Sequence, residues 1–150
     1  MAHYAKIGLD NIVENVVVVA DADTSTSGGI EKESIGVAFL TSNTGHSVWK
    51  KCSYNTEDGM HHQGGTPYRA NFPSIGWTYN SEHDIFVEPR PEDKDGESCN
   101  SWTLNTTTGR YVAPLTKPDH TQDMSNNGEV WVWDESAYQA DNTQGWTKGS

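Results

Sequence analysis

The sequence predicts an α+β fold that is mainly β, built from antiparallel hairpins with one short helix and consecutive Trp-containing β-hairpins in the C-terminal half. First, the chain is only 33% hydrophobic with a mean hydropathy of −0.74, yet its six Trp and six Tyr are too many aromatic residues for a disordered chain. Second, short β-branched and aromatic runs alternate with Gly, Asn and Asp turns. Third, one hairpin-like unit is written twice, as GWTYNSEHDIFVEP and as SWTLNTTTGRYVAP.

The length of 150 residues predicts a single domain, residues 1–150, with a core that needs no metal or cofactor. Within it, residues 1–70 are expected to form a sheet-and-helix body and residues 71–150 the repeated Trp hairpins. The first element expected is a hairpin over residues 3–20, with its turn at Asp10-Asn11, because Asp and Asn tolerate positive φ. The valine run at 16–19 predicts a strand buried on both faces near the centre of the sheet.

One helix is predicted near residues 30–42, ending at Gly45, with Ile35, Ala38 and Phe39 in the core. Residues 48–55, VWKKCSYN, predict a strand. The turn-rich stretch from residue 56 to residue 74 predicts a long exposed loop.

The repeated unit begins at residues 76 and 101. Each copy predicts a hairpin with an aromatic residue on both arms, because side chains two residues apart share one strand face. The first copy places Trp77 and Tyr79 on one arm and Phe86 on the other. Since a lone hairpin is marginal in water, these units are expected to pack on a common body or on a partner. A looser third copy begins at Val130.

The net charge of −11 opposes nucleic-acid binding, which needs clustered Lys and Arg. No apolar run is long enough to span a membrane, and the N-terminus has no signal-peptide pattern. We therefore expect no nucleic-acid or membrane partner. Without an export signal, Cys52 and Cys99 are expected to be reduced and packed.

Searches for reaction chemistry find no pattern that singles out catalytic residues. The acidic loop at residues 21–32 fails the EF-hand pattern, because Thr26 stands where Gly is required and Lys32 where Glu is required. The segment DKDGE at 93–97 indicates an exposed acidic turn. Phosphate-binding, nucleophile-elbow and zinc-protease motifs are not found. We expect a non-enzymatic protein without catalytic, cofactor-binding or metal-binding residues.

Several blocks occur together in order: MAHYAKIGLDNIVENVVVV, CSYN, NFPSIGWTYNSEHDIFVEPRP and SWTLNTTTGRYVAP. This arrangement resembles small virion structural proteins of marine tailed phages, in particular cyanophages. The resemblance implies a capsid decoration or a tail-associated component that is assembled in the host cytoplasm and located in the virion.

The expected function is therefore capsid decoration, with the major capsid protein as the expected partner and a homo-oligomer left open. A tail- or fibre-associated component is the alternative, and a carbohydrate-binding module that stacks aromatic rings on sugars is a further alternative. Because interface anchors are enriched in Trp, Tyr and Arg, partner contacts are predicted for five residues. They are Trp131, Trp133, Trp146, Tyr68 and Arg69.

Overall fold

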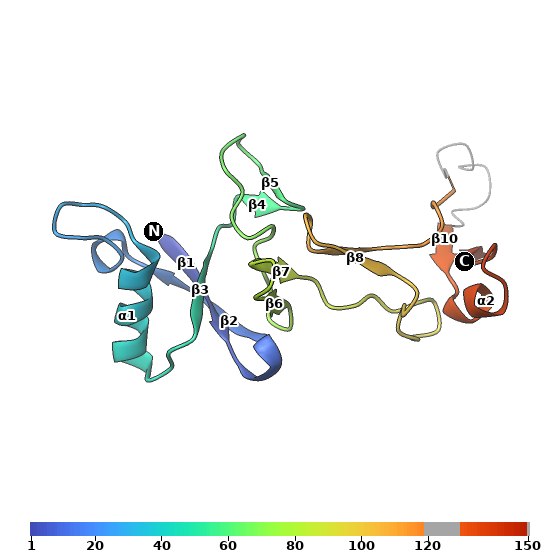
Figure 1. Cartoon of the computed structure of the whole chain (residues 1–150), viewed down its shortest axis with the longest axis horizontal. Helices are drawn as coiled ribbons and strands as arrows, with labels where there is room; N and C mark the ends of the chain where they lie inside the picture. The colour runs from blue at the N-terminus through green and yellow to red at the C-terminus, as the bar shows by residue number, and fades with distance from the viewer. Residues whose placement is uncertain (119–129, 150) are drawn as a thin grey trace. The chain divides into compact units, whose positions relative to one another are not determined.

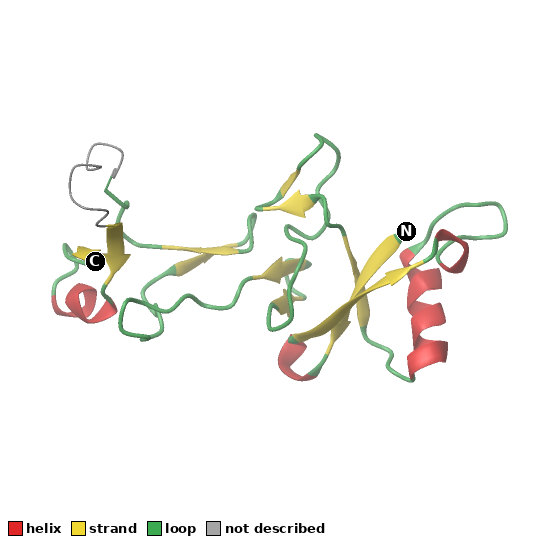
Figure 2. Cartoon of the chain, turned by 180° about the vertical axis from the view of Figure 1, so that it is seen from behind, coloured by secondary structure: helices red, strands yellow, loops and turns green. Residues whose placement is uncertain are grey.

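The structure, a computed structural model, describes residues 1–118 and 130–149 and confirms a mainly β fold of small antiparallel sheets (Figure 1). Figure 2 shows short strands joined by long loops, with α1 as the longest helix in the described part of the chain. The chain divides into two compact units, Met1–Pro89 with Thr106–Arg110 and Arg90–Asn105 with Tyr111–Ser150. The single domain and its expected inner division after residue 70 stay predictions.

The first unit is organised by a three-stranded sheet in the order β2-β1-β3. β1 (Ala2–Ile7) pairs antiparallel with β2 (Val13–Val19) and with β3 (Trp49–Cys52). The predicted hairpin is confirmed, and Asp10 and Asn11 in the 3-10 turn (Leu9–Asn11) have φ of 56° and 60°. The central position predicted for the valine run is wrong. β1 is central, and β2 is an edge strand on which Val18 is exposed.

Helix α1 (Glu33–Thr44) covers one face of this sheet (Figure 1). Leu40 packs there on Tyr4, Val19 and Trp49. The helix begins at Glu33 rather than near residue 30, because the preceding chain pairs back in a bridge between Ser25 and Glu31, after the 3-10 turn Asp21–Asp23.

The prediction of the helix core is right in part: Phe39 packs against the core cluster, whereas Ala38 does not lie in it. Gly36 and Leu40 are buried, Ile35 and Phe39 are half-buried, and Ala38 is exposed. The reason is Tyr4, whose ring reaches the helix at Gly36 and so turns that face inward. The predicted end is confirmed, since Gly45 caps the helix with a left-handed φ of 78°.

The opposite face of the sheet is covered by the first repeated unit. β6 (Thr78–Asn80) and β7 (Ile85–Val87) form the predicted hairpin, with Tyr79 directly opposite Phe86 and their ring centroids 5.7 Å apart. Both rings belong to a core cluster that includes Ala5, Ile7 and Cys52 of the sheet. The prediction that the hairpin packs on a common body is confirmed.

The stretch from residue 56 to residue 74 was predicted to be an exposed loop, and this is wrong in part. It contains a small hairpin, β4 (Thr56–Glu57) with β5 (Met60–His61), and its end is buried at Asn71 and Pro73. The Asn71 amide donates to the carbonyls of Phe86 and Thr108 at 3.0 and 2.7 Å, and its oxygen accepts from the amide of Asp58. The Asn71 side chain thus satisfies backbone groups that have no neighbouring strand to bond with. A contact of this kind leaves no periodic pattern in the sequence, so it could not be predicted.

In the C-terminal half, β8 (Thr103–Asn105) pairs with β9 (Arg110–Val112), which confirms the second copy as a hairpin. The third copy differs. β10 (Val130–Trp133) runs into helix α2 (Glu135–Ala140), which Asp134 caps, and β11 (Trp146–Gly149) then returns beside β10. Among the described residues, no helix combines the length and apolar character needed to cross a membrane.

Candidate functional site

The five residues predicted to contact a partner fall in different units. Tyr68 and Arg69 belong to the first unit, and Trp131, Trp133 and Trp146 belong to the second. Their surroundings decide which side chains are still able to face a partner.

Arg69 is enclosed by the first unit, with a side chain only 10% exposed. Its guanidinium donates to both carboxylate oxygens of Glu33, at 2.5 and 3.2 Å, and to Asp84 at 2.7 Å. Burial alone would lower the pKa of Arg69, but the bonds to Glu33 and Asp84 raise it well above its ordinary value. The arginine is therefore a permanent cation that ties α1 to the β6–β7 hairpin.

The same ion pair closes one end of strand β3. The backbone amide of Lys51 donates to Glu33 at 2.7 Å, and the carbonyl of Lys51 accepts from Arg69 at 2.8 Å. The two side chains thus occupy the positions that a neighbouring strand would take. We call Glu33 and Arg69 the edge clamp.

Tyr68 completes this network from the surface side. Its hydroxyl donates to Glu33 at 3.0 Å, and its ring lies 5.0 Å from the Arg69 guanidinium. Burial is the main cause that raises the pKa of Tyr68 to about 12. Tyr68 and Arg69 therefore hold the fold together, and the polar groups that a partner would need are already bonded.

Trp133 lies at the centre of the second unit and is 4% exposed. Its ring centroid is 5.1 Å from that of Trp146, 5.8 Å from that of Trp102 and 5.5 Å from that of Tyr138. The pairs with Trp146 and Trp102 are edge-to-face, and such pairs contribute about 0.5–1.5 kcal/mol each beyond their buried area. Trp133 is a core residue and does not project from the surface.

Glu135 lies next to this aromatic core and is 4% exposed. It accepts hydrogen bonds from the Trp133 indole at 3.0 Å, from the Ser101 hydroxyl at 2.6 Å and from the Gln139 amide at 2.7 Å. Burial raises the pKa of Glu135, but these bonds outweigh burial and hold it below its ordinary value. The sequence gives no period or motif that marks this buried carboxylate.

Trp146 and Trp131 are half-buried. Trp146 donates from its indole to the Leu115 carbonyl at 2.8 Å and walls a pocket of about 410 Å³ together with Trp102 and Tyr111. The Trp131 ring lies under the ammonium of Lys148, at 5.5 Å. These two tryptophans keep an accessible face, so partner contact stays a prediction for them.

Three carboxylates, those of Asp93, Asp95 and Asp134, come within 4.8 Å of one another. The chain's own donors already satisfy them. Asp93 accepts from the amides of Asp95, Glu97 and Glu135, and the Lys94 ammonium lies 2.8 Å from Asp95 and 3.8 Å from Asp134. The cluster fits the acidic turn predicted for residues 93–97, now with Asp134 beside it.

Two aliphatic side chains project from neighbouring turns of the first unit. Leu9 is 89% exposed and Ile75 is 70% exposed. The amide of Val13, the first residue of β2, donates to the Trp77 carbonyl at 2.7 Å, and the Gly76 amide donates to the Val13 carbonyl at 2.8 Å, so the segments that follow Leu9 and Ile75 are joined. Sequence reasoning missed this feature, which we call the turn patch, because its two halves are 66 residues apart.

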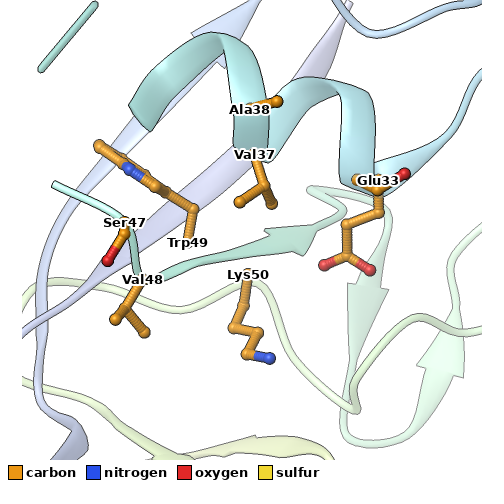
Figure 3. Close-up of a pocket in the computed structure, with 8 residues that line it drawn as sticks. Glu33, Val37, Ala38, Ser47, Val48, Trp49 and Lys50 are labelled. Atoms are coloured by element: carbon orange, nitrogen blue, oxygen red, sulfur yellow. The ribbon is translucent and has the colours of Figure 1, made fainter. Parts of the chain in front are cut away.

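A groove of about 480 Å³ lies along strand β3, beneath helix α1 (Figure 3). The helix contributes Ser34, Val37 and Ala38, and the strand side contributes Val48, Trp49 and Lys50. Figure 3 shows Trp49 on the helix side of the strand and Val48 and Lys50 on the other side. The groove therefore spans both faces of the sheet at its edge.

Comparison with known proteins found no matching family model, no matching curated protein and no matching solved structure.

Proposed function

We propose that this protein is a non-enzymatic virion structural protein, and that it decorates the capsid shell by docking on the major capsid protein. The resemblance of its ordered sequence blocks to small phage virion proteins supports the proposal. The network around Arg69 agrees with it, because the polar side chains gathered there are held in hydrogen bonds that stabilise the fold.

The turn patch is the observation that carries the proposal. Leu9 and Ile75 are exposed aliphatic side chains on segments that backbone hydrogen bonds join, and exposed apolar side chains on fixed backbone are candidates for contact with a partner. Each contact is small, so a single copy is expected to bind weakly. Many identical sites on a symmetric shell would compensate for that weakness. Trp131 and Trp146 are the second set of expected anchors.

The test is binding of the purified protein to empty shells, measured as copies bound at saturation. Decoration requires saturation close to the number of lattice sites. Leu9→Asp and Ile75→Asp are expected to weaken binding about tenfold or more, because each buries a charge at the contact. Ile30→Asp is the matched control, since Ile30 is also an exposed aliphatic residue of the first unit. Saturation far from the number of lattice sites would refute decoration.

The location on intact virions separates this proposal from the tail alternative. Density spread over the shell supports decoration, whereas density confined to the tail supports a tail- or fibre-associated component.

Carbohydrate binding is the second candidate, favoured by the pocket walled by Trp102, Tyr111 and Trp146. Its size falls in the range of small-molecule sites, and aromatic walls can stack on sugar rings. Addition of sugars that changes the tryptophan fluorescence of the wild type but not of Tyr111→Ala would support this function. Silence on a glycan array together with unchanged fluorescence would exclude it.

A further inference from the structure

Strand β3 is an edge strand whose backbone is closed at one end and open at the other. It pairs with β1 alone, and the edge clamp occupies the outward amide and carbonyl of Lys51. In an antiparallel ladder the outward-facing residues alternate. Since Lys51 faces outward and Val48 accepts inward from the amide of Ile7, the amide and carbonyl of Trp49 also face outward.

Within the described chain, no side chain or loop from outside the sheet is bonded to those two groups of Trp49. They open instead on the groove along β3. Because this groove spans both faces of the sheet edge, it occupies the place of a fourth strand rather than that of a compact ligand (Figure 3). An extended segment placed there could exchange two backbone hydrogen bonds with Trp49.

The walls specify the side chains of that segment. A residue opposite Trp49 points toward the helix, where Val37 and Ala38 leave room for a small apolar side chain. Its neighbours point to the other face, one beside Val48 and one beside Lys50. The carboxylate of Glu33 is neutralised by Arg69. The Lys50 ammonium lies 5.2 Å from the Tyr79 ring and acts on the Asp84 carboxylate, but no salt bridge is found for it among the described residues, so a carboxylate on the added segment complements it.

We propose that this groove binds an extended segment of a partner protein by β-strand addition to β3, with the antiparallel core sequence glutamate, valine, valine. Glutamate lies beside Lys50, the central valine beneath α1, and the last valine beside Val48. The edge clamp sets the register, because it blocks extension of the added strand past Lys51.

The probe is a blocked pentapeptide, acetyl-Thr-Glu-Val-Val-Thr-amide, titrated into the full-length ¹⁵N-labelled protein. Binding is expected in the range of about 0.1–1 mM, because the contact is short. Amide shifts should appear at residues 47–50 and 34–38, and hydrogen exchange of the Trp49 amide should slow. A peptide with proline at the central position should not bind, since it has no amide to donate.

Two variants test the site. Ala38→Trp fills the groove from an exposed helix position and should abolish the shifts, whereas Ser42→Trp, on the same helix but outside the groove, should not. Lys50→Glu should weaken the glutamate peptide about fivefold and strengthen a peptide with lysine in its place by a similar factor.

The charge exchange keeps the proposal testable even if Ala38→Trp does not fold. Absence of shifts at about 1 mM peptide, or shifts that survive Ala38→Trp in a folded protein, would overturn the proposal. The result is independent of capsid decoration, because shell binding is measured with variants of the turn patch and strand addition with variants of the groove.

Discussion

Replacement of Gly36 by alanine tests the packing of helix α1 on Tyr4, because helix propensity and this packing predict opposite changes in stability. Helix propensity alone predicts that alanine stabilises a helix interior by about 1 kcal/mol relative to glycine. The structure predicts a loss. A Cβ at residue 36 would lie 2.1 Å from the hydroxyl oxygen of Tyr4 and 2.4 Å from its Cζ atom. Tyr4 is fully buried on the central strand, so its ring has no free space into which it could retreat.

The cost follows from the shift that the clash requires. To reach ordinary van der Waals contact, which begins at 3.4 Å, α1 and the Tyr4 ring must separate by about 1.3 Å or more, which loosens the packing of Leu40 against Trp49. Overpacking of this kind typically costs about 1–3 kcal/mol, and severe cases cost more. A 2.1 Å approach is close enough to place the cost in the upper part of that range, so after the propensity gain we expect Gly36→Ala to lower the free energy of unfolding by about 1–2 kcal/mol.

Urea unfolding followed by far-UV circular dichroism measures this change. Ser42→Ala, at an exposed position of the same helix, is the control and should be neutral or stabilising by up to about 0.5 kcal/mol. The double variant Tyr4→Phe with Gly36→Ala should recover only part of the loss, because the ring carbon remains too close. Equal or greater stability of Gly36→Ala would refute the packing proposed between Tyr4 and α1.

Three further predictions follow from single contacts. Tyr4→Phe should be neutral or stabilising by up to about 1 kcal/mol in urea unfolding, because the Tyr4 hydroxyl is buried without a partner among the described residues. Tyr79→Phe should instead destabilise by about 1 kcal/mol, because it loses the bond to Asp84. A larger loss of stability in Tyr4→Phe than in Tyr79→Phe would contradict this prediction. Burial raises the pKa of Glu33, but the bonds from Arg69 and Lys51 outweigh burial and hold that pKa below its ordinary value of 4.5. The melting temperature should therefore fall as the pH falls below about 4.5, because protonation of Glu33 weakens these bonds. Glu33→Gln should make the melting temperature less dependent on pH in this range. An equally steep fall in the variant would contradict the assignment. Cys52 and Cys99 are free and buried, and burial raises the pKa of their thiols to about 12 and about 11, so a thiol reagent at pH 8 should modify them only after denaturation. Rapid modification of the native protein would show that the thiols are accessible.

The sequence predicts the local elements well, because their causes are local. Positive φ at Asp10 and Asn11, the glycine cap at Gly45 and the aromatic pair of the β6–β7 hairpin each depend on residues within one turn or one hairpin. The order of strands in the sheet depends on distant contacts. The valine run satisfies the same β preference at an edge as at the centre, so composition could not place β2.

The predicted partner residues show the same limit. Tyr68 and Arg69 were selected by residue type, but the carboxylates that bind Arg69 lie 36 and 15 positions away in the sequence. Trp133 was selected because it lies in the irregular third copy of the repeat. Helix α2 follows it directly, and the Trp133 ring is buried in the aromatic core. Residue type predicts a strong contact in each case. It does not predict whether the contact is within the chain or with a partner.

The composition explains why many of the aromatic residues and Arg69 lie inside the two units rather than on their surfaces. A chain with only 33% hydrophobic residues has few aliphatic side chains with which to fill two compact units. Its interiors therefore contain tryptophans, tyrosines and the ion pair of Arg69 with Glu33. Trp, Tyr and Arg are the residue types that usually anchor interfaces, but around Arg69 and Trp133 they make contacts within the chain. In the described part of the chain, the proposed partner contacts are the turn patch, the open backbone of Trp49 and the accessible faces of Trp131 and Trp146. Recognition through backbone and small aliphatic contacts is weak for each copy, and it suits a protein whose partner presents many identical sites.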